Sequence, residues 1–257
     1  MSSKLIAVIS PAKLLDESSR YPELKSSEIS FGVEAEHLTN QLRKLKARDL
    51  GELMDLSEKL AIENVERFQQ WQLPFTSSNS LQAILMFKGD VYRGLKAEEL
   101  GAKQLEWAQS HLRILSGLYG ILRPLDLIQP YRLMMGTPFS PNKDIKNLYQ
   151  YWGNRLTDHI KADLDPKGVV VNIASSEYFK AINKTVLDRR VVNCEFKEKK
   201  GTGYAIVSTY AKQARGKMAR FIIENKITKP SDLQAFDTEG YCFNPKVSTD
   251  HDYVFTR

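Results

Sequence analysis

Two glycines three residues apart interrupt an apolar stretch that has arginines close behind it. Gly117 and Gly120 lie in the segment LSGLYGILRPLDLIQPYRL, residues 115–133. Without Cβ atoms the backbone can turn tightly, adopt positive φ and bring several N–H groups close to a ligand. A following helix adds the positive end of its dipole, so the turn is typical of an anion site, usually for phosphate. The predicted phosphate-binding hairpin consists of Ser116, Gly117, Leu118, Tyr119, Gly120 and Arg123.

The same residues also fit a simpler structure, in which a glycine ends one helix and an ordinary loop follows. The helical hairpin additionally requires that Pro124 lie in the first turn of the second helix, where its missing N–H is tolerated. Both interpretations stand on spacing alone.

A second group of residues forms a cationic helix face. Wound at about 100° per residue, residues 210–226 place a narrow apolar stripe opposite a wide positive face. Nine Lys and Arg against three Asp and Glu fall between Glu195 and Lys229, and the rest of the chain balances. Such clustering attracts polyanions, although a merely solvated basic face is the common alternative. The basic cleft is predicted to contain Lys13, Lys88, Arg132, Lys180, Lys212, Arg215, Lys217 and Arg220.

Loops that join apolar runs to lysines and carboxylates offer a third kind of chemistry. Lys13 follows a predicted strand directly, and strand ends are where α/β sheets tend to place ligands. The alternative is that these loops are capped helix starts. An enzyme acting on a phosphorylated, nucleotide or nucleic-acid substrate would draw on Lys13, Lys88, Asp90, Glu177, Lys180 and Arg215.

Other site patterns are missing from the sequence. The S-x-x-K match at Ser10–Lys13 lacks the S-D-N and K-T-G partners of serine acyltransferases. The four histidines, at 37, 111, 159 and 251, have no partner at metal-ligand spacing, and there is no C-x-x-C. Neither a nucleotide P-loop nor a G-x-G-x-x-G fingerprint occurs. We therefore expect no metal site and no cofactor.

The elements that position these residues alternate along the whole chain. Apolar runs predict buried strands at 5–10 and 168–173, and strands at 191–199 and 204–209 form a predicted hairpin. Helices are expected at 33–46, 49–71, 101–115 and 211–226, and short strands near 241–243 and 253–256. Without a linker or repeat, residues 1–257 predict one α/β domain of mixed α+β type, with a central mixed sheet, surrounding helices and a helix-hairpin-helix-like element.

Composition and charge indicate in which cellular compartment the protein is expected. The chain is 42% hydrophobic with a net charge of +6, and no apolar run approaches the roughly 18 residues of a membrane helix. The N-terminal apolar run is too short for a signal peptide. Two isolated cysteines are typical of a reducing compartment. We expect a cytoplasmic protein that does not bind membranes.

Several strings together resemble the YaaA family of bacterial peroxide stress proteins, in order along nearly the whole chain. These strings are SPAK at 10–13, FKGDVYRGL at 87–95, LSGLYGILRPLDLIQPYRL at 115–133, YQYWG at 149–153, NIASSEYFK at 172–180 and YAKQARGKMARFIIEN at 210–225. The resemblance implies a cytoplasmic protein that limits oxidative damage by lowering free iron. It also implies DNA binding through a helix-hairpin-helix element in an unusual α/β fold with a positive cleft, and it offers no catalytic residue to carry over.

Two hypotheses from different classes follow. The first is binding of double-stranded DNA, including bulged or damaged duplex, through phosphate contacts without base specificity. The second is an enzyme in the same basic cleft. The two differ in geometry, because an enzyme should gather Lys13, Asp90 and Lys180 into one concave pocket. A DNA-binding protein should instead spread its cations along an open groove.

Overall fold

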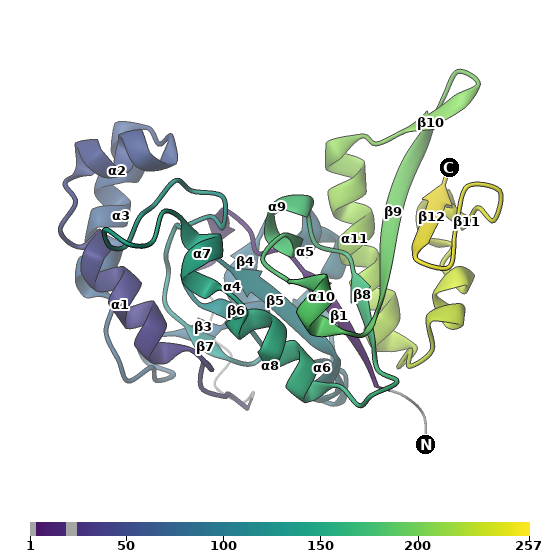
Figure 1. The fold of residues 1–257 in the computed structure, drawn as a ribbon, viewed down its shortest axis with the longest axis horizontal. Helices are drawn as coiled ribbons and strands as arrows, with labels where there is room; N and C mark the ends of the chain where they lie inside the picture. Colours follow the sequence, from purple (N-terminus) through teal and green to yellow (C-terminus); the bar gives the residue numbers. More distant parts are fainter. Residues whose placement is uncertain (1–3, 19–24) are drawn as a thin grey trace.

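A twisted sheet of mostly parallel strands runs through the middle of the computed structural model, which describes residues 4–18 and 25–257 (Figure 1). The strand order is β11-β12-β9-β8-β1-β5-β6, and β10 pairs with β9 beyond this path. The strands of this sheet are β1 (Leu5–Ile9), β5 (Leu112–Ser116), β6 (Gly120–Leu122), β8 (Val169–Asn172), β9 (Arg190–Lys200), β10 (Gly203–Ala205), β11 (Cys242–Phe243) and β12 (Asp252–Thr256).

The strand connections change direction at the centre of the sheet. Strand β1 runs parallel to β5 on one side and to β8 on the other, and β8, β9 and β12 continue outward in parallel. The chain therefore leaves β1 toward β5, and later crosses back to build the other half of the sheet from β8. The neighbours β1 and β8 flank this topological switch point, and their carboxyl ends are where such sheets form a ligand crevice.

Helices and two short strand pairs surround the sheet. In Figure 1, α1, α2 and α3 lie beyond the β6 edge, and the β9–β10 hairpin projects from the opposite side. The short pairs are β2 (Leu14–Leu15) with β4 (Phe87–Lys88), and β3 (Leu81–Gln82) with β7 (Leu127–Ile128). The helices are α1 (Gly32–Leu42), α2 (Ala47–Met54), α3 (Glu58–Gln70), α4 (Ala83–Met86), α5 (Asp90–Leu95), α6 (Ala102–His111), α7 (Leu148–Trp152), α8 (Arg155–Asp163), α9 (Ser176–Phe179), α10 (Lys184–Leu187) and α11 (Ser208–Glu224).

The predicted fold class is confirmed: the described residues form an α/β domain whose sheet mixes parallel and antiparallel strands. The buried strands predicted at 5–10 and 168–173 are the completely buried β1 and the largely buried β8. The predicted helix at 49–71 is two helices, α2 and α3, and Ser57 occupies the N-cap position of the second. The predicted helix at 101–115 ends at His111, because LRILS continues as β5.

The helix-hairpin-helix prediction is wrong. The segment around the two glycines is a β-hairpin, in which β5 and β6 pair antiparallel with Ser116 opposite Gly120. Leu118 and Tyr119 are completely buried at the turn. The Tyr119 N–H donates to the Ser116 hydroxyl at 2.9 Å, so this amide is already bonded inside the protein. The turn is therefore buried and does not present the exposed amides that the predicted phosphate site requires.

Close packing explains both glycines. A Cβ on Gly117 would lie 2.3 Å from the backbone oxygen of Leu133. Gly120 has a φ of +70° and would place a Cβ 2.7 Å from the Trp152 ring. The spacing that resembled an anion site therefore serves a tight, buried turn.

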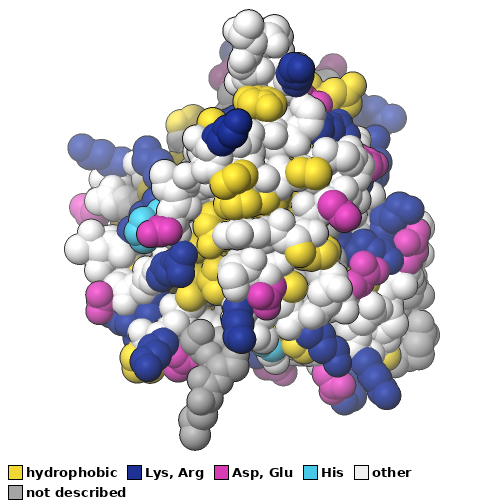
Figure 2. Space-filling model, turned by 90° about the vertical axis from the view of Figure 1, so that its right-hand side faces the viewer, with side chains coloured by type: hydrophobic (Ala, Val, Ile, Leu, Met, Phe, Trp, Pro, Cys, Tyr) yellow, Lys and Arg dark blue, Asp and Glu magenta, His cyan; other side chains and the backbone are white. Residues whose placement is uncertain are grey.

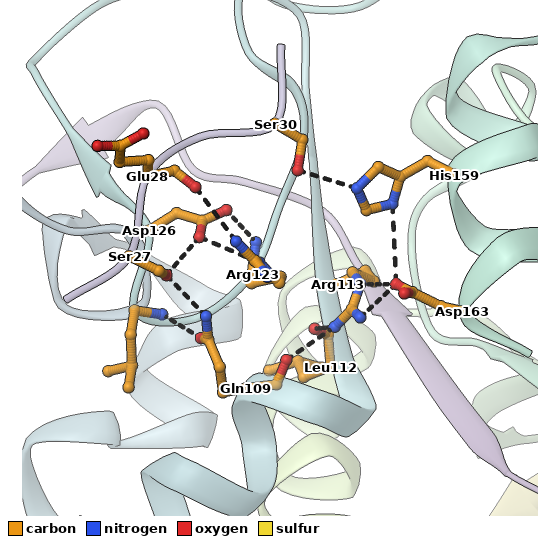
Figure 3. A network of polar contacts seen from close by, with 11 residues as sticks. Ser27, Glu28, Ser30, Gln109, Leu112, Arg113, Arg123, Asp126, His159 and Asp163 are labelled. Carbon is orange, nitrogen blue, oxygen red and sulfur yellow. Dashed lines mark hydrogen bonds and ion pairs between the residues drawn. The ribbon is translucent and has the colours of Figure 1, made fainter. Parts of the chain in front are cut away.

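Arg123, the last residue of the predicted hairpin, makes hydrogen bonds to other parts of the protein. Figure 3 shows its guanidinium turned toward the buried Asp126 carboxylate and the Glu28 carbonyl, at 3.2 Å from each. Its role is to attach the segment before α1 to the sheet.

Candidate anion-binding cleft

A cleft of about 400 Å³ lies at the carboxyl ends of β1 and β8, at the topological switch point. Ser10 follows β1 and Ser175 follows β8, and the Ser175 N–H donates to the Ser10 hydroxyl at 2.8 Å. This volume falls within the range of small-molecule sites. The other lining residues are residues 11–14, Lys88, Gly89, Asp90, Val91, Arg93, residues 131–134, Glu177, Tyr178, Lys212 and Arg215.

Five of the eight predicted cleft cations line this one hollow. They are Lys13, Lys88, Arg132, Lys212 and Arg215. They come from four segments distant in sequence, so the fold itself brings them together. The pairing of β2 with β4 explains why Lys13 and Lys88 are neighbours. It sets Leu14 opposite Lys88, and Lys13 directly precedes Leu14.

The carboxylates expected of an enzyme also line the cleft. Asp90 follows Gly89, whose φ of +120° makes the sharp turn from β4 into α5. Glu177 stands in α9, where its Oε1 accepts the Gly136 N–H at 3.0 Å. Lys180, the third residue of the enzyme criterion, lies outside, with its Nζ 5.0 Å from the centre of the Tyr149 ring. The criterion is therefore met by two of its three residues.

Positive charge dominates the wall of the cleft, where six Lys and Arg stand against two carboxylates. The sixth cation, Arg93, is not among those predicted from the sequence. It lies one helical turn after Asp90, and its guanidinium pairs with the Asp90 carboxylate at 3.2 Å. Lys88 pairs with Asp16 at 3.5 Å. Within residues 4–18 and 25–257, the four other lining cations make no ion pair: Lys13, Arg132, Lys212 and Arg215.

Arg215 is the most enclosed of the four. Its Nε is shielded from solvent and has no hydrogen-bond partner among the described residues. Burial lowers the pKa of its guanidinium, and the charge of Glu195 acts in the opposite direction. A half-buried cation without a partner loses part of its hydration, so such a group is expected to have a role.

Helix packing determines where Arg215 stands. The next residue, Gly216, faces α5, and a Cβ there would lie 1.8 Å from the backbone oxygen of Val91. Gly94 in α5 similarly meets the backbone oxygen of Gln213. Because neither glycine has a side chain, the two helices touch at their backbones. This contact brings Lys212 and Arg215 of α11 to the same hollow as Asp90 and Arg93 of α5.

Arg132 links the cleft to a second, more open hollow of about 810 Å³. Burial and the nearby charge of Arg67 both lower the pKa of Arg132, whereas Glu63 and Tyr178 oppose them. Lys13 and Lys88 line both hollows as well. Asp16, Glu17 and Glu63 also line this second hollow, where they pair with Lys88 and Arg67, so among the described residues only Lys13 and Arg132 extend the unpaired positive charge into it.

The structure does not bring Lys180, Lys217 or Arg220 into the cleft. Lys217 pairs with Glu239, and Arg220 bonds the carboxylates of Glu99 and Glu224. On the face seen in Figure 2, Lys and Arg side chains are scattered among acidic and apolar ones. Lys217 and Arg220, two cations of the segment 195–229, are therefore engaged in ion pairs within the fold.

The described part of the chain contains neither a metal-binding cluster nor a membrane-spanning helix. Within the described part of the chain, no group of three or more His, Cys, Asp and Glu side chains is placed to hold a metal ion. None of the helices described there combines the length and apolar character needed to cross a bilayer.

Comparison with known proteins places the chain in a family. The family model described as peroxide stress protein YaaA matches residues 5–247. A UPF0246 protein of Cellvibrio japonicus is 46% identical over 255 residues, and one of Idiomarina loihiensis is 48% identical over 255 residues. A third, from Burkholderia orbicola, is 46% identical over 257 residues, and each alignment covers 98% of both chains. The chain belongs to the YaaA family of peroxide stress proteins.

Proposed function

We propose that this protein binds a phosphorylated ligand, a nucleotide or a nucleic-acid phosphate, in the cationic cleft, and that this binding is its contribution to the peroxide response. The observation that carries the proposal is the set of four lining cations without ion pairs in the described chain, at the carboxyl ends of parallel strands. Unpaired cations in a concave, partly enclosed site create a strong positive potential, which an anion neutralises.

Phosphate fits this wall better than a single carboxylate would. A phosphate group presents several acceptor oxygens and up to two negative charges, so several cations can contact it at once. Arg132 and Arg215 supply planar guanidinium groups that match phosphate geometry, and Lys13 and Lys212 supply point charges. We place this binding in the cytoplasm, and the unpaired Cys194 and Cys242 support a reducing compartment.

A second candidate is DNA binding without base specificity, including bulged or damaged duplex. It is favoured by Lys13, Lys88 and Arg132, which line both the enclosed cleft and the open hollow. A strand could follow these cations across the surface while an unpaired nucleotide enters the cleft. The buried β5–β6 turn has no part in this proposal.

Calorimetric titration with pyrophosphate, a mononucleotide and a short duplex tests the proposal. Arg215→Gln should weaken binding by about tenfold or more, because a charge-assisted hydrogen bond contributes about 1.5–3 kcal/mol. Lys226→Gln is the matched control, since this exposed lysine follows α11 and does not line the cleft. Equal losses in both variants would refute a specific site, as would unchanged affinity in Arg215→Gln.

The duplex arm requires a salt titration. Phosphate contacts release counterions, so affinity for DNA should fall steeply with salt, and the slope should decrease when Arg132 is replaced by Gln. Samples from the same titration can be analysed for hydrolysis products. Product formation that depends on Asp90 or Glu177 would establish that chemistry follows binding.

A further inference from the structure

We infer that the cleft selects a terminal phosphate monoester over an internal phosphodiester. The monoester could be that of a free nucleotide or sugar phosphate, or the phosphorylated end of a nucleic-acid strand. This inference rests on the proposed function, since it specifies which phosphate the same site takes.

The depth of Arg215 is the first reason. The guanidinium lines the cleft, while its Nε is inaccessible to solvent. Among the residues that the structure describes, no carboxylate contacts it, and Glu195 influences it only from beyond ion-pair distance. Because Arg215 is half-buried and lines the cleft, an anion that neutralises its charge must enter the cleft.

The shape of the site is the second reason. The backbone contact of α5 with α11 closes one side, and the segment at 131–134 lies on the wall as well. The phenol rings of Tyr131 and Tyr178 are buried and also line the site. An internal phosphodiester carries a sugar on both sides, so it has to lie across an opening. A terminal phosphate has one free side and can enter first.

Charge is the third reason. A phosphate monoester carries about −1.5 to −2 at pH 7, whereas a diester carries a single charge. The cleft offers four cations without ion pairs in the described chain. Asp90 pairs with Arg93, and Glu177, which accepts the Gly136 N–H, keeps its single negative charge, so the cations remain in excess. The more highly charged ligand gains more from this surplus.

The stress response provides a chemical context. Radical attack on deoxyribose cleaves the sugar–phosphate chain and leaves strand ends that carry phosphate monoesters. A cleft that binds such an end, or the mononucleotide released from it, would bind a direct product of oxidative damage.

A matched pair of ligands tests the inference. Adenosine 5′-monophosphate and adenosine 3′,5′-cyclic monophosphate share base and sugar, but only the first is a monoester. By calorimetry at pH 7.5, we expect the monoester to bind on the order of tenfold tighter, a ratio worth about 1.4 kcal/mol. Arg215→Gln should reduce the ratio toward one, and Lys226→Gln should leave it unchanged. Thermal denaturation of each variant establishes that it is folded.

The pH dependence provides an independent readout. The second ionisation of a phosphate monoester has a pKa of about 6, so binding of the monoester should tighten as pH rises from about 5 to 7. The cyclic diester has no such ionisation and reports any titration of the protein. The charged and titratable groups that line the cleft are Lys13, Lys88, Asp90, Arg93, Tyr131, Arg132, Glu177, Tyr178, Lys212 and Arg215.

The outcomes separate this inference from the proposed function. Equal affinity for both nucleotides, lost together in Arg215→Gln, would overturn the inference and leave phosphate binding in place. No phosphate binding that depends on cleft residues would overturn both. Oligonucleotides of one sequence, with and without a 5′- or 3′-phosphate, distinguish a strand end from a free nucleotide. A preference for any phosphorylated end supports the inference, and indifference to it in both oligonucleotide and mononucleotide arms contradicts it.

Discussion

The contact between α5 and α11 gives the sharpest stability prediction. In Gly216→Ala, the new Cβ would lie 1.8 Å from the Val91 backbone oxygen and 2.8 Å from the Leu95 backbone nitrogen. Non-bonded heavy atoms rest about 3.5 Å apart, so the helices would have to separate by roughly 1.5 Å. The opposing atoms belong to backbone and cannot rotate away. Alanine also favours the helix by about 1 kcal/mol relative to glycine.

Overpacking of this kind costs about 1–3 kcal/mol or more, so it should exceed the gain in helix propensity. We expect a net loss of about 2 kcal/mol in the free energy of unfolding, which corresponds to a fall in Tm of roughly 5 °C. Chemical denaturation with urea, followed by circular dichroism, measures the change. Because Arg215 precedes Gly216, phosphate affinity should fall as well.

A second helical glycine is the matched control. A Cβ on Gly51 in α2 would be 3.6 Å from the nearest heavy atom, which is ordinary contact. Gly51→Ala should therefore stabilise the protein, by about 0.5–1 kcal/mol. If Gly216→Ala proved as stable as the wild type, or if both variants changed stability in the same direction, the close approach of α5 and α11 would be wrong.

The remaining predictions concern buried charges. Arg113 is almost completely buried and bonds Asp163 at 2.5 Å (Figure 3), so Asp163→Ala should cost about 3–5 kcal/mol in urea denaturation. Burial alone would raise the pKa of Asp163, but its bonds to Arg113 prevail and lower it; the stabilisation is present above about pH 4 and is lost as the pH falls further. Burial lowers the pKa of His159, so its contribution is present above about pH 6.5 and declines below it, and His159→Gln should remove that part of the pH profile. Arg220→Gln should destabilise the protein by about 1 kcal/mol through its lost ion pairs yet leave phosphate affinity unchanged.

The strands β1 and β8 could be predicted from their uninterrupted apolar runs, and α11 from apolar residues at helical spacing. The segment 112–122 could not. Its residues are buried on every side, so apolar spacing does not distinguish a strand from the end of a helix. Two glycines in a tight turn then fit an exposed anion site and a buried β-turn equally well.

The sequence predicts the kinds of residue that line the cleft, but not which individual residues line it. The sequence shows polar residues at the ends of apolar runs, among them Lys13, Asp90 and Glu177. Whether these residues converge depends on the strand order, which the sequence does not reveal. Lys217 and Arg220 share a helix with Arg215, and their spacing matches a common face. Glu224, one partner of Arg220, lies in the same helix, but Glu99 and Glu239 come from segments distant in sequence, outside residues 195–229.

The tether between Glu177 and Gly136 has a consequence for how the cleft can adapt. On the side of α5 and α11, the two helix backbones are in direct contact, so the helices cannot move closer together. On the side of residues 131–136, the Leu133 backbone packs against Gly117, and Glu177 and Tyr178 of α9 bond the backbone of Gly136 and Met135. Both walls should therefore keep their positions when a ligand enters, and adjustment to ligands of different size should fall to the exposed lysine side chains, Lys13 and Lys212.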